Sequence, residues 1–193
     1  MKHNFTLIEL LATIGIIVIL AGILVPVVIG AVKKGEAAKA KAEITTLVNA
    51  IKQFENTYSK LPVPLYDDTT NYSVTGTVVQ SVNANLIQAL QGDDTIKNAA
   101  DKKVNPRQVR FLDIRNTGAG DYLDPWGRAY RIIMSRDEEI SLTALGAAGK
   151  YADGTIHQSV VVWSAGPDGV WDNKDDVHSF EAEYEAGKWQ LAN

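Results

Sequence analysis

One uninterrupted apolar segment limits most strongly what this chain can fold into. From Leu10 to Val32 the sequence has 23 consecutive residues without a charge, and Thr13 is the only polar side chain among them. As an α-helix, a segment of this length can cross a hydrocarbon layer about 30 Å thick. Helices buried in soluble cores are seldom so long and apolar on every face. The sequence therefore predicts a membrane-spanning helix.

A secretory signal peptide is the main alternative, because the apolar segment lies close to the N-terminus. Signal peptides usually have an apolar region of only about 7 to 15 residues. The segment here is longer, and Glu9 lies inside the apolar stretch that begins at Phe5. We therefore favour the membrane span over the signal peptide.

Glu9 needs a physical explanation, since a carboxylate inside a bilayer costs about 2.5–3.5 kcal/mol and usually has a partner. The segment Leu10–Val32 contains no Lys, Arg or His to neutralise it. A cut just before Phe5 would create an α-amino group, and the amino group of a neighbouring parallel helix could reach Glu9. Glu9 is thus predicted to be an assembly residue, unless it lies near enough to the membrane surface to stay hydrated.

Pro26 interrupts the hydrogen-bonding pattern of the same helix. A proline removes one backbone bond, here to the carbonyl of Gly22, and crowds the preceding turn. Carbonyl groups freed in a membrane must find other partners. A simple kink and a locally melted segment both remain possible interpretations.

The segment after the apolar run, Lys33 to Lys60, is helical in pattern but amphipathic. Its apolar residues follow spacings of 4, 3, 4, 3 and 4: Ala40, Ile44, Leu47, Ile51, Phe54 and Tyr58. This spacing predicts an apolar stripe on a water-exposed helix, which must pack on the rest of the chain. A continuous helix from Phe5 to Lys60 would end before Pro62 and Pro64, which cannot extend it.

The rest of the chain predicts an α+β fold with an antiparallel sheet. Strands are expected at Arg128–Ser135 and Gln158–Ser164, with a weaker one at Glu139–Leu145 and a final edge at Lys188–Leu191. In the middle, residues 74–82 predict a short β segment and residues 83–91 a short helix. The turn Asp124-Pro125-Trp126-Gly127 is expected to lead into a strand and to bury Trp126.

An acidic loop follows the second main strand. Between Ala165 and Asp176, four carboxylates occur within nine residues: Asp168, Asp172, Asp175 and Asp176. They repel one another unless water or a cation neutralises them, and oxygen ligands on a curled loop are those that Ca²⁺ prefers. The spacing differs from that of an EF-hand. A solvated acidic turn is the alternative.

Composition argues against several function classes. The chain of 193 residues has a formal net charge of −4, no Cys and only three His, at 3, 157 and 178. An acidic chain without a basic block is not expected to bind nucleic acid. We find no Ser-His-Asp order, Gly-rich phosphate loop or His cluster, so we expect a protein that is not an enzyme and has no catalytic residues; His157 and His178 are expected at the surface.

The N-terminus, Met1-Lys2-His3-Asn4 followed by Phe5-Thr6-Leu7-Ile8-Glu9, resembles the leader and cleavage motif of the type IV pilin and type II secretion pseudopilin superfamily. The resemblance implies cleavage between Asn4 and Phe5 by a membrane prepilin peptidase, and N-methylation of Phe5. It makes Glu9 the glutamate of that family, and Pro26 falls where the family commonly has a proline. One departure is Asn4, since the family usually has Gly before the cut.

The C-terminal region is similar to that of the major, G-type pseudopilin, in which an acidic loop binds calcium. The similar features are Asp-Pro-Trp-Gly followed by an aromatic residue, a strand, and a Gly-x-Asp-Gly loop that ends in paired acids. The resemblance implies Ca²⁺ as a possible cofactor. Its ligands would be the carboxylates of Asp168, Asp175 and Asp176 and the carbonyls of Ala165 and Val170. Asp172 is an additional acid outside this set.

The resemblance also implies a pilin-like fold with five segments: a leader (1–4), a transmembrane and assembly helix (5–32), an amphipathic stem helix (33–61), a variable connection (62–121) and a β-sheet region with the acidic loop (122–193). It implies a structural subunit of a type II secretion pseudopilus, which an inner-membrane platform and an ATPase polymerise with copies of itself and with other pseudopilins. A type IV pilus subunit with an adhesive role and a membrane-tethered domain that never polymerises are the alternatives.

The resemblance further implies a single-pass protein of the bacterial inner membrane, with its globular part in the periplasm until assembly into the filament. The charges alone predict the opposite orientation. Lys33, Lys34, Lys39 and Lys41 follow the span, and only Lys2 and the amino terminus precede it. Flanking lysines favour the cytoplasmic side. The expected orientation therefore depends on the resemblance.

Overall fold

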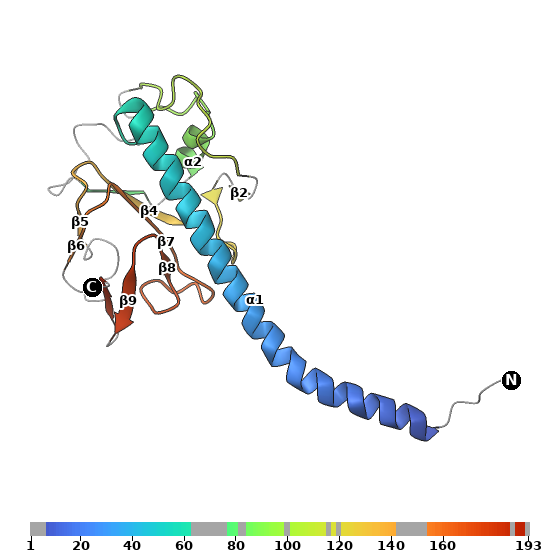
Figure 1. The fold of residues 1–193 in the computed structure, drawn as a ribbon. Helices are drawn as coiled ribbons and strands as arrows, with labels where there is room; N and C mark the ends of the chain where they lie inside the picture. The colour runs from blue at the N-terminus through green and yellow to red at the C-terminus, as the bar shows by residue number, and fades with distance from the viewer. Residues whose placement is uncertain are drawn as a thin grey trace. The chain divides into compact units, whose positions relative to one another are not determined.

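The computed structural model describes residues 7–62, 77–80, 84–98, 101–114, 117–118, 121–141, 154–185 and 188–191. The chain forms two compact units, Met1–Ala38 and Lys39–Asn193. One helix, α1 (Leu7–Tyr58), provides the described part of the first unit and begins the second (Figure 1). The predicted long N-terminal helix is therefore confirmed over these residues.

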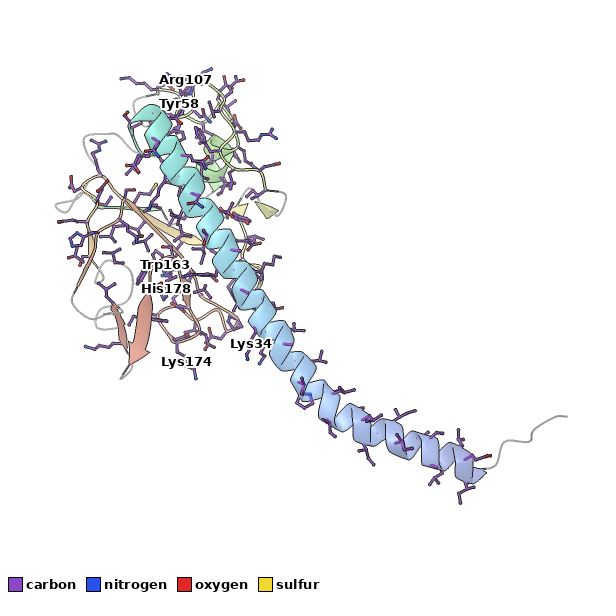
Figure 2. The ribbon with its side chains drawn as sticks, viewed as in Figure 1. Lys34, Tyr58, Arg107, Trp163, Lys174 and His178 are labelled. Carbon is purple, nitrogen blue, oxygen red and sulfur yellow. The ribbon has the colours of Figure 1, made fainter. Side chains whose placement is uncertain are left out.

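In the first unit, α1 carries apolar side chains that stand out on all its faces (Figure 2). The only polar side chain within the apolar run, Thr13, donates its hydroxyl to the Leu10 carbonyl at 2.8 Å. Such a bond satisfies the hydroxyl within its own helix. Pro26 lies inside the helix, and the helical backbone continues through it. This part of α1 is long and apolar enough to cross a membrane.

The end of α1 agrees with the sequence pattern to within two residues. Tyr58 is the last helical residue, and Ser59 adopts a left-handed φ of 53°. The Ser59 amide donates to the Glu55 carbonyl at 2.7 Å, which satisfies a carbonyl at the end of the helix. Pro62 follows three residues later and could not have continued the helix.

The second unit is organised by a four-stranded antiparallel sheet with the order β1-β4-β7-β8. Its strands are β1 (Thr77–Gln80), β4 (Arg131–Ser135), β7 (Val160–Ser164) and β8 (Val177–His178). The central pair aligns Ile132 with Val162 and Met134 with Val160. The predicted strands at β4 and β7 are confirmed, and the middle region of the chain supplies the edge strand β1.

The C-terminal half of α1 packs against one face of this sheet. The predicted stripe is buried from Ala40 to Phe54, while Tyr58 is partly buried. It joins alternate residues of the central strands in one core, among them Ile132, Met134, Val160 and Val162. The alternation of side chains along a strand places these residues on the same face.

The opposite face of the sheet carries a second apolar cluster. Its buried members are Ile133, Ile140, Ile156, Val161, Trp163, Phe180 and Trp189. Because both faces are covered, all five residues of β7 are buried. Strands buried on both faces have continuous apolar runs instead of alternating ones, as Val160-Val161-Val162-Trp163 has.

Three two-stranded ladders and one short helix complete the described fold. β2 (Thr117–Gly118) pairs with β3 (Asp121–Tyr122), β5 (Ile140–Ser141) with β6 (Thr155–Ile156), and β9 (Ala182–Glu185) with β10 (Lys188–Leu191). The final strand is thus confirmed, but it pairs with β9 and not with the edge of the main sheet. The predicted short helix is α2 (Ala84–Leu90), which buries Leu86, Ile87 and Leu90.

The predicted burial of Trp126 is wrong. Trp126 is only partly buried, whereas Asp124 and Tyr130 on either side of it are 1% exposed. The Asp124 carboxylate accepts hydrogen bonds from the backbone amides of Trp126 (3.0 Å) and Arg128 (2.8 Å). A buried carboxylate must be satisfied in this way, so the acid and not the tryptophan fixes this turn.

Candidate functional site

Two parts of the chain are candidates for function: the apolar half of α1 and the acidic loop that follows β7. Asn4 and Phe5, the residues of the predicted cleavage and methylation site, lie outside the described residues. Glu9 lies in the first turn of α1 and is exposed. An acidic residue at this position interacts favourably with the positive end of the helix dipole. Its backbone position is therefore suited to a charged side chain.

The side chains around Glu9 and beyond it are strongly exposed for apolar residues. Leu7 and Ile8 are 80% and 74% exposed, and the exposure continues to Val32. Contiguous apolar surface of this kind marks sites that contact a membrane or another protein. The structure places Pro26 within the same exposed segment, so both predicted assembly residues share one apolar surface.

In the acidic loop, Asn173 connects three of the predicted calcium-binding residues, Asp168, Val170 and Asp175. Its Nδ2 group donates to Asp168 Oδ2 at 2.8 Å and to the Val170 carbonyl at 2.9 Å. Its Oδ1 atom accepts the Asp175 amide at 2.8 Å. Sequence reasoning missed this residue. An amide that can both donate and accept, placed among four acids, was the signal that could have identified it.

The loop also buries two carboxylates. Asp172 and Asp176 are each 6% exposed, and the Asp172 amide donates to Asp176 Oδ2 at 2.9 Å. Among the described residues, the other oxygen of Asp176 is buried without a hydrogen-bond partner. Burial, together with the charges of Asp172 and Asp168, raises the pKa of Asp176 to about 7. Burial therefore favours the protonated form of this carboxyl group over the charged form.

The predicted calcium ligands are not brought together as a finished site. Asp168 and Val170 are exposed, Asp175 is partly buried, and Ala165 and Asp176 are buried. Within the described part of the chain, no three acidic or histidine side chains are grouped closely enough to hold a metal ion. The oxygen-only donors and the buried Asp176 oxygen nevertheless suit a hard cation such as Ca²⁺. Asp176 is the predicted ligand whose surroundings most favour one.

Aromatic residues hold the loop against the second apolar cluster. Arg131 lies over the Trp171 ring, 3.9 Å from its centroid, and Trp171 makes an edge contact with Trp163. The indole of Trp189 in β10 donates to the Asn173 carbonyl at 3.0 Å. Residues of three strands, β4, β7 and β10, thus hold the loop at Trp171 and Asn173.

His178 is buried, so the expectation that it lies at the surface is wrong. It is paired with Trp163 across the β7–β8 ladder (Figure 2). Its ring makes an edge contact with the Trp189 ring, with 4.4 Å between the centroids. Burial, and secondarily the Lys41 charge, lowers the pKa of His178 to about 3. The Lys41 ammonium donates to the His178 carbonyl at 2.7 Å, which ties α1 to the strand after the loop.

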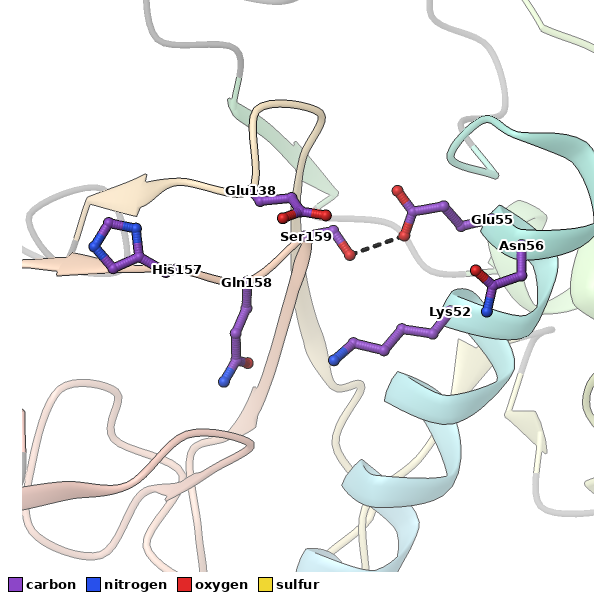
Figure 3. Close-up of a pocket in the computed structure, with 7 residues that line it drawn as sticks. All are labelled: Lys52, Glu55, Asn56, Glu138, His157, Gln158 and Ser159. Carbon is purple, nitrogen blue, oxygen red and sulfur yellow. Dashed lines mark hydrogen bonds between the residues drawn. The ribbon is translucent and has the colours of Figure 1, made fainter.

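A polar pocket of about 270 Å³ lies between α1 and the segment before β7 (Figure 3). It is lined by Lys52, Glu55, Asn56, Glu138, His157, Gln158 and Ser159. Glu55 accepts the Ser159 hydroxyl at 2.8 Å, and the exposed His157 ring is turned away from the α1 side chains. Glu55 therefore has a structural role, joining the helix to the sheet.

Comparisons of this chain with protein-family models, with curated proteins and with solved structures find no match.

Proposed function

We propose that this protein is a structural subunit of a membrane-associated filament of the type II secretion pseudopilus kind. The observation that carries the proposal is the contrast within α1. Its first part is apolar and exposed on all faces, and its second part buries one stripe against the sheet. A helix of the first kind needs lipid or other apolar helices around it, and a filament core supplies the latter.

Glu9 favours polymerisation over a simple membrane anchor. An anchor has no use for an acid in its apolar segment, and the acid adds a cost to insertion. The cost is offset if a neighbouring subunit, trimmed to begin at Phe5, places its α-amino group beside Glu9. In the filament we propose, each subunit is cut after Asn4 by a prepilin peptidase, is methylated on Phe5, and is then taken from the inner membrane by an assembly platform and its ATPase.

The intact mass of the protein isolated from its native membrane tests this proposal. We expect the loss of Met1 to Asn4 and the gain of one methyl group. A substituted protein, Phe5→Ala, is the matched control, because it alters the predicted cleavage site and leaves Glu9 in place. A native protein that retains its full leader would contradict the proposal and would favour a tethered domain that never polymerises.

We also propose that the acidic loop binds Ca²⁺ in the folded protein. Asp176 provides a buried carboxylate, one oxygen of which has no hydrogen-bond partner in the part of the chain that the structure describes. Asp168, Asp175 and the carbonyls of Ala165 and Val170 are the other candidate ligands in this loop. A bound divalent cation would offset the repulsion among the four acids. Since a ligand that binds only the folded state stabilises it, calcium should raise the melting temperature of the protein.

The calcium proposal is tested by melting the full-length protein in detergent, with Ca²⁺ and with a chelator. We expect a higher melting temperature with Ca²⁺, and the loss of that increase in a variant carrying Asp175→Ala and Asp176→Ala. Asp113→Ala is the control, because Asp113 is an exposed acid outside the loop. Equal melting temperatures in calcium and chelator would contradict this proposal and leave the filament proposal standing.

A further inference from the structure

The turn at Asp124 and the acidic loop are joined at one residue, Gly166. The buried Ser164 hydroxyl donates to Asp124 Oδ2 at 2.5 Å and accepts the Gly166 amide at 3.1 Å. From the other side, Arg128 Nη1 donates to the Gly166 carbonyl at 2.9 Å. The Gly166 amide is thus bound by the Ser164 hydroxyl, which Asp124 holds, and the Gly166 carbonyl is bound by Arg128 itself.

Two glycines leave the space that this arrangement needs. A Cβ atom on Gly169 would lie 2.3 Å from the Arg128 Cζ atom, and one on Gly166 would lie 2.0 Å from the Asp175 carbonyl oxygen. Both glycines have left-handed backbone conformations, with a φ of 71° at Gly169 and 64° at Gly166. The Arg128 guanidinium therefore lies directly against the first half of the loop, and the second half closes onto Gly166.

We propose that Arg128 is a positioning residue that, together with Asp124 and Ser164, preforms the acidic loop in the absence of any metal. Its guanidinium fixes the Gly166 carbonyl and adds a positive charge beside a loop that contains four carboxylates. A planar guanidinium holds a carbonyl at a defined angle, which the ammonium of a lysine does not do. The Asp-Pro-Trp-Gly turn and the acidic loop then form one structural unit, although 38 residues separate Arg128 from Gly166.

Hydrogen exchange of the full-length protein in detergent with a chelator tests the metal-free part of this proposal. Gly166, Val170, Asp172 and Asp175 donate amide hydrogen bonds that hold the loop. Loss of a charged hydrogen bond should speed their exchange about tenfold or more in Arg128→Gln and in Arg128→Lys. Exchange in β4 and β7 should stay as in the unsubstituted protein, as should all exchange in the control Arg110→Gln, which alters an exposed arginine.

Ser164→Ala tests the same unit from its other side, because it removes the hydroxyl that links Asp124 to Gly166. It should speed exchange in the loop selectively, even if Arg128→Gln proves to unfold the whole domain. Loop exchange that is unchanged in both Arg128 variants would overturn the proposal. So would acceleration in β4 and β7 equal to that in the loop for Ser164→Ala.

Calcium binding provides a second readout, and this part rests on the proposed calcium function. Titration with Ca²⁺, followed by the fluorescence of Trp171 and its neighbours, should give an affinity about tenfold weaker for Arg128→Gln, without rescue in Arg128→Lys. If Arg128 acted only as a competing charge, its removal would strengthen binding, which would overturn the positioning role. An unsubstituted protein that does not respond to Ca²⁺ would contradict the calcium proposal alone, since the exchange experiment needs no metal.

Discussion

The two halves of α1 differ both in how much apolar side chain they carry and in how that apolar surface is arranged around the helix. In residues 7–32 the apolar side chains cover every face of the helix and are exposed. In residues 39–58 they form one stripe, and this stripe is buried against the sheet. The same secondary structure thus serves two environments, and the angular distribution of apolar residues decides which one each half requires.

The polar residues of the two halves also differ in the partners that they contact. In the second half, Glu43 accepts the Tyr130 hydroxyl at 2.7 Å, Glu55 accepts the Ser159 hydroxyl, and Lys41 binds the His178 carbonyl. These are bonds between the helix and the sheet of a single subunit. For the first half we have proposed that Glu9 is paired between subunits. Paired substitutions, one in each half, can therefore separate folding from assembly.

The largest difference is expected from matched leucine truncations. Leu47 is fully buried, so Leu47→Ala should lower the free energy of unfolding of the second unit by about 2–5 kcal/mol through lost burial and a cavity. Leu20→Ala, in the exposed half, should change it by less than about 0.5 kcal/mol. Chemical denaturation in detergent, followed by tryptophan fluorescence, measures both. If both substitutions lowered the free energy of unfolding equally, the proposed difference between the halves would be contradicted, because both halves would then stabilise the same folded unit.

A matched pair of acidic residues is expected to separate two different properties. Glu43→Ala removes the acceptor of the Tyr130 hydroxyl and should cost about 1.5–3 kcal/mol of unfolding free energy without affecting self-association. Glu9→Ala should leave the unfolding free energy unchanged and abolish most self-association in the membrane. Cross-linking of membrane fractions measures the association. Assembly that survives Glu9→Ala would remove this acid from the proposed subunit contact.

Two lysines, Lys41 in the second half and Lys34 just after the apolar run, should differ by a smaller amount. Lys41→Met loses the 2.7 Å bond to the His178 carbonyl and should lower the unfolding free energy by about 1 kcal/mol. Lys34 is exposed, and Lys34→Met should have no measurable effect on the same transition. Thermal melts at one detergent concentration are sufficient to compare the two. A larger effect from Lys34→Met would show that the charged segment after the span contributes to folding.

The smallest effect is expected for two threonines, and here the two halves should behave alike. Thr13 and Thr45 are both exposed, and each donates its hydroxyl to a carbonyl of its own helix at 2.8 Å. Because these bonds stay within one helix and face the surroundings, each substitution by alanine should change the unfolding free energy by less than about 0.5 kcal/mol. A larger effect for Thr45→Ala alone would reveal a contact that the helix periodicity does not predict.

Local periodicity predicted much of the fold. The stripe from Ala40 to Phe54, the strands β4 and β7 and the helix α2 each come from short-range patterns, and the structure confirms them. The partner of β10 could not be predicted, since register and pairing depend on residues distant in the chain. The burial of His178 was missed for the same reason, because the Trp189 ring that lies against it belongs to a later strand.

The acidic loop was recognised from its composition, but its internal structure was not. Four clustered acids indicated a repulsion that either water or a cation would relieve. The residues that hold the loop are an amide, Asn173, and a guanidinium, Arg128, which comes from an earlier turn. Neither residue type is distinctive in a sequence. Their importance lies in the atoms they reach, and this is known only once the chain is folded.

The order of residues is enough to locate where this chain is apolar on every side, where it is apolar on one side, and where its acids gather. These features depend on residues within a few helical turns or one strand. Folding in three dimensions was needed to show that the sheet is covered on both faces and that Asp124, Ser164 and Arg128 hold the loop at Gly166. Such contacts join residues tens of positions apart, and packing and hydrogen-bond geometry select them among many pairings that the sequence alone permits.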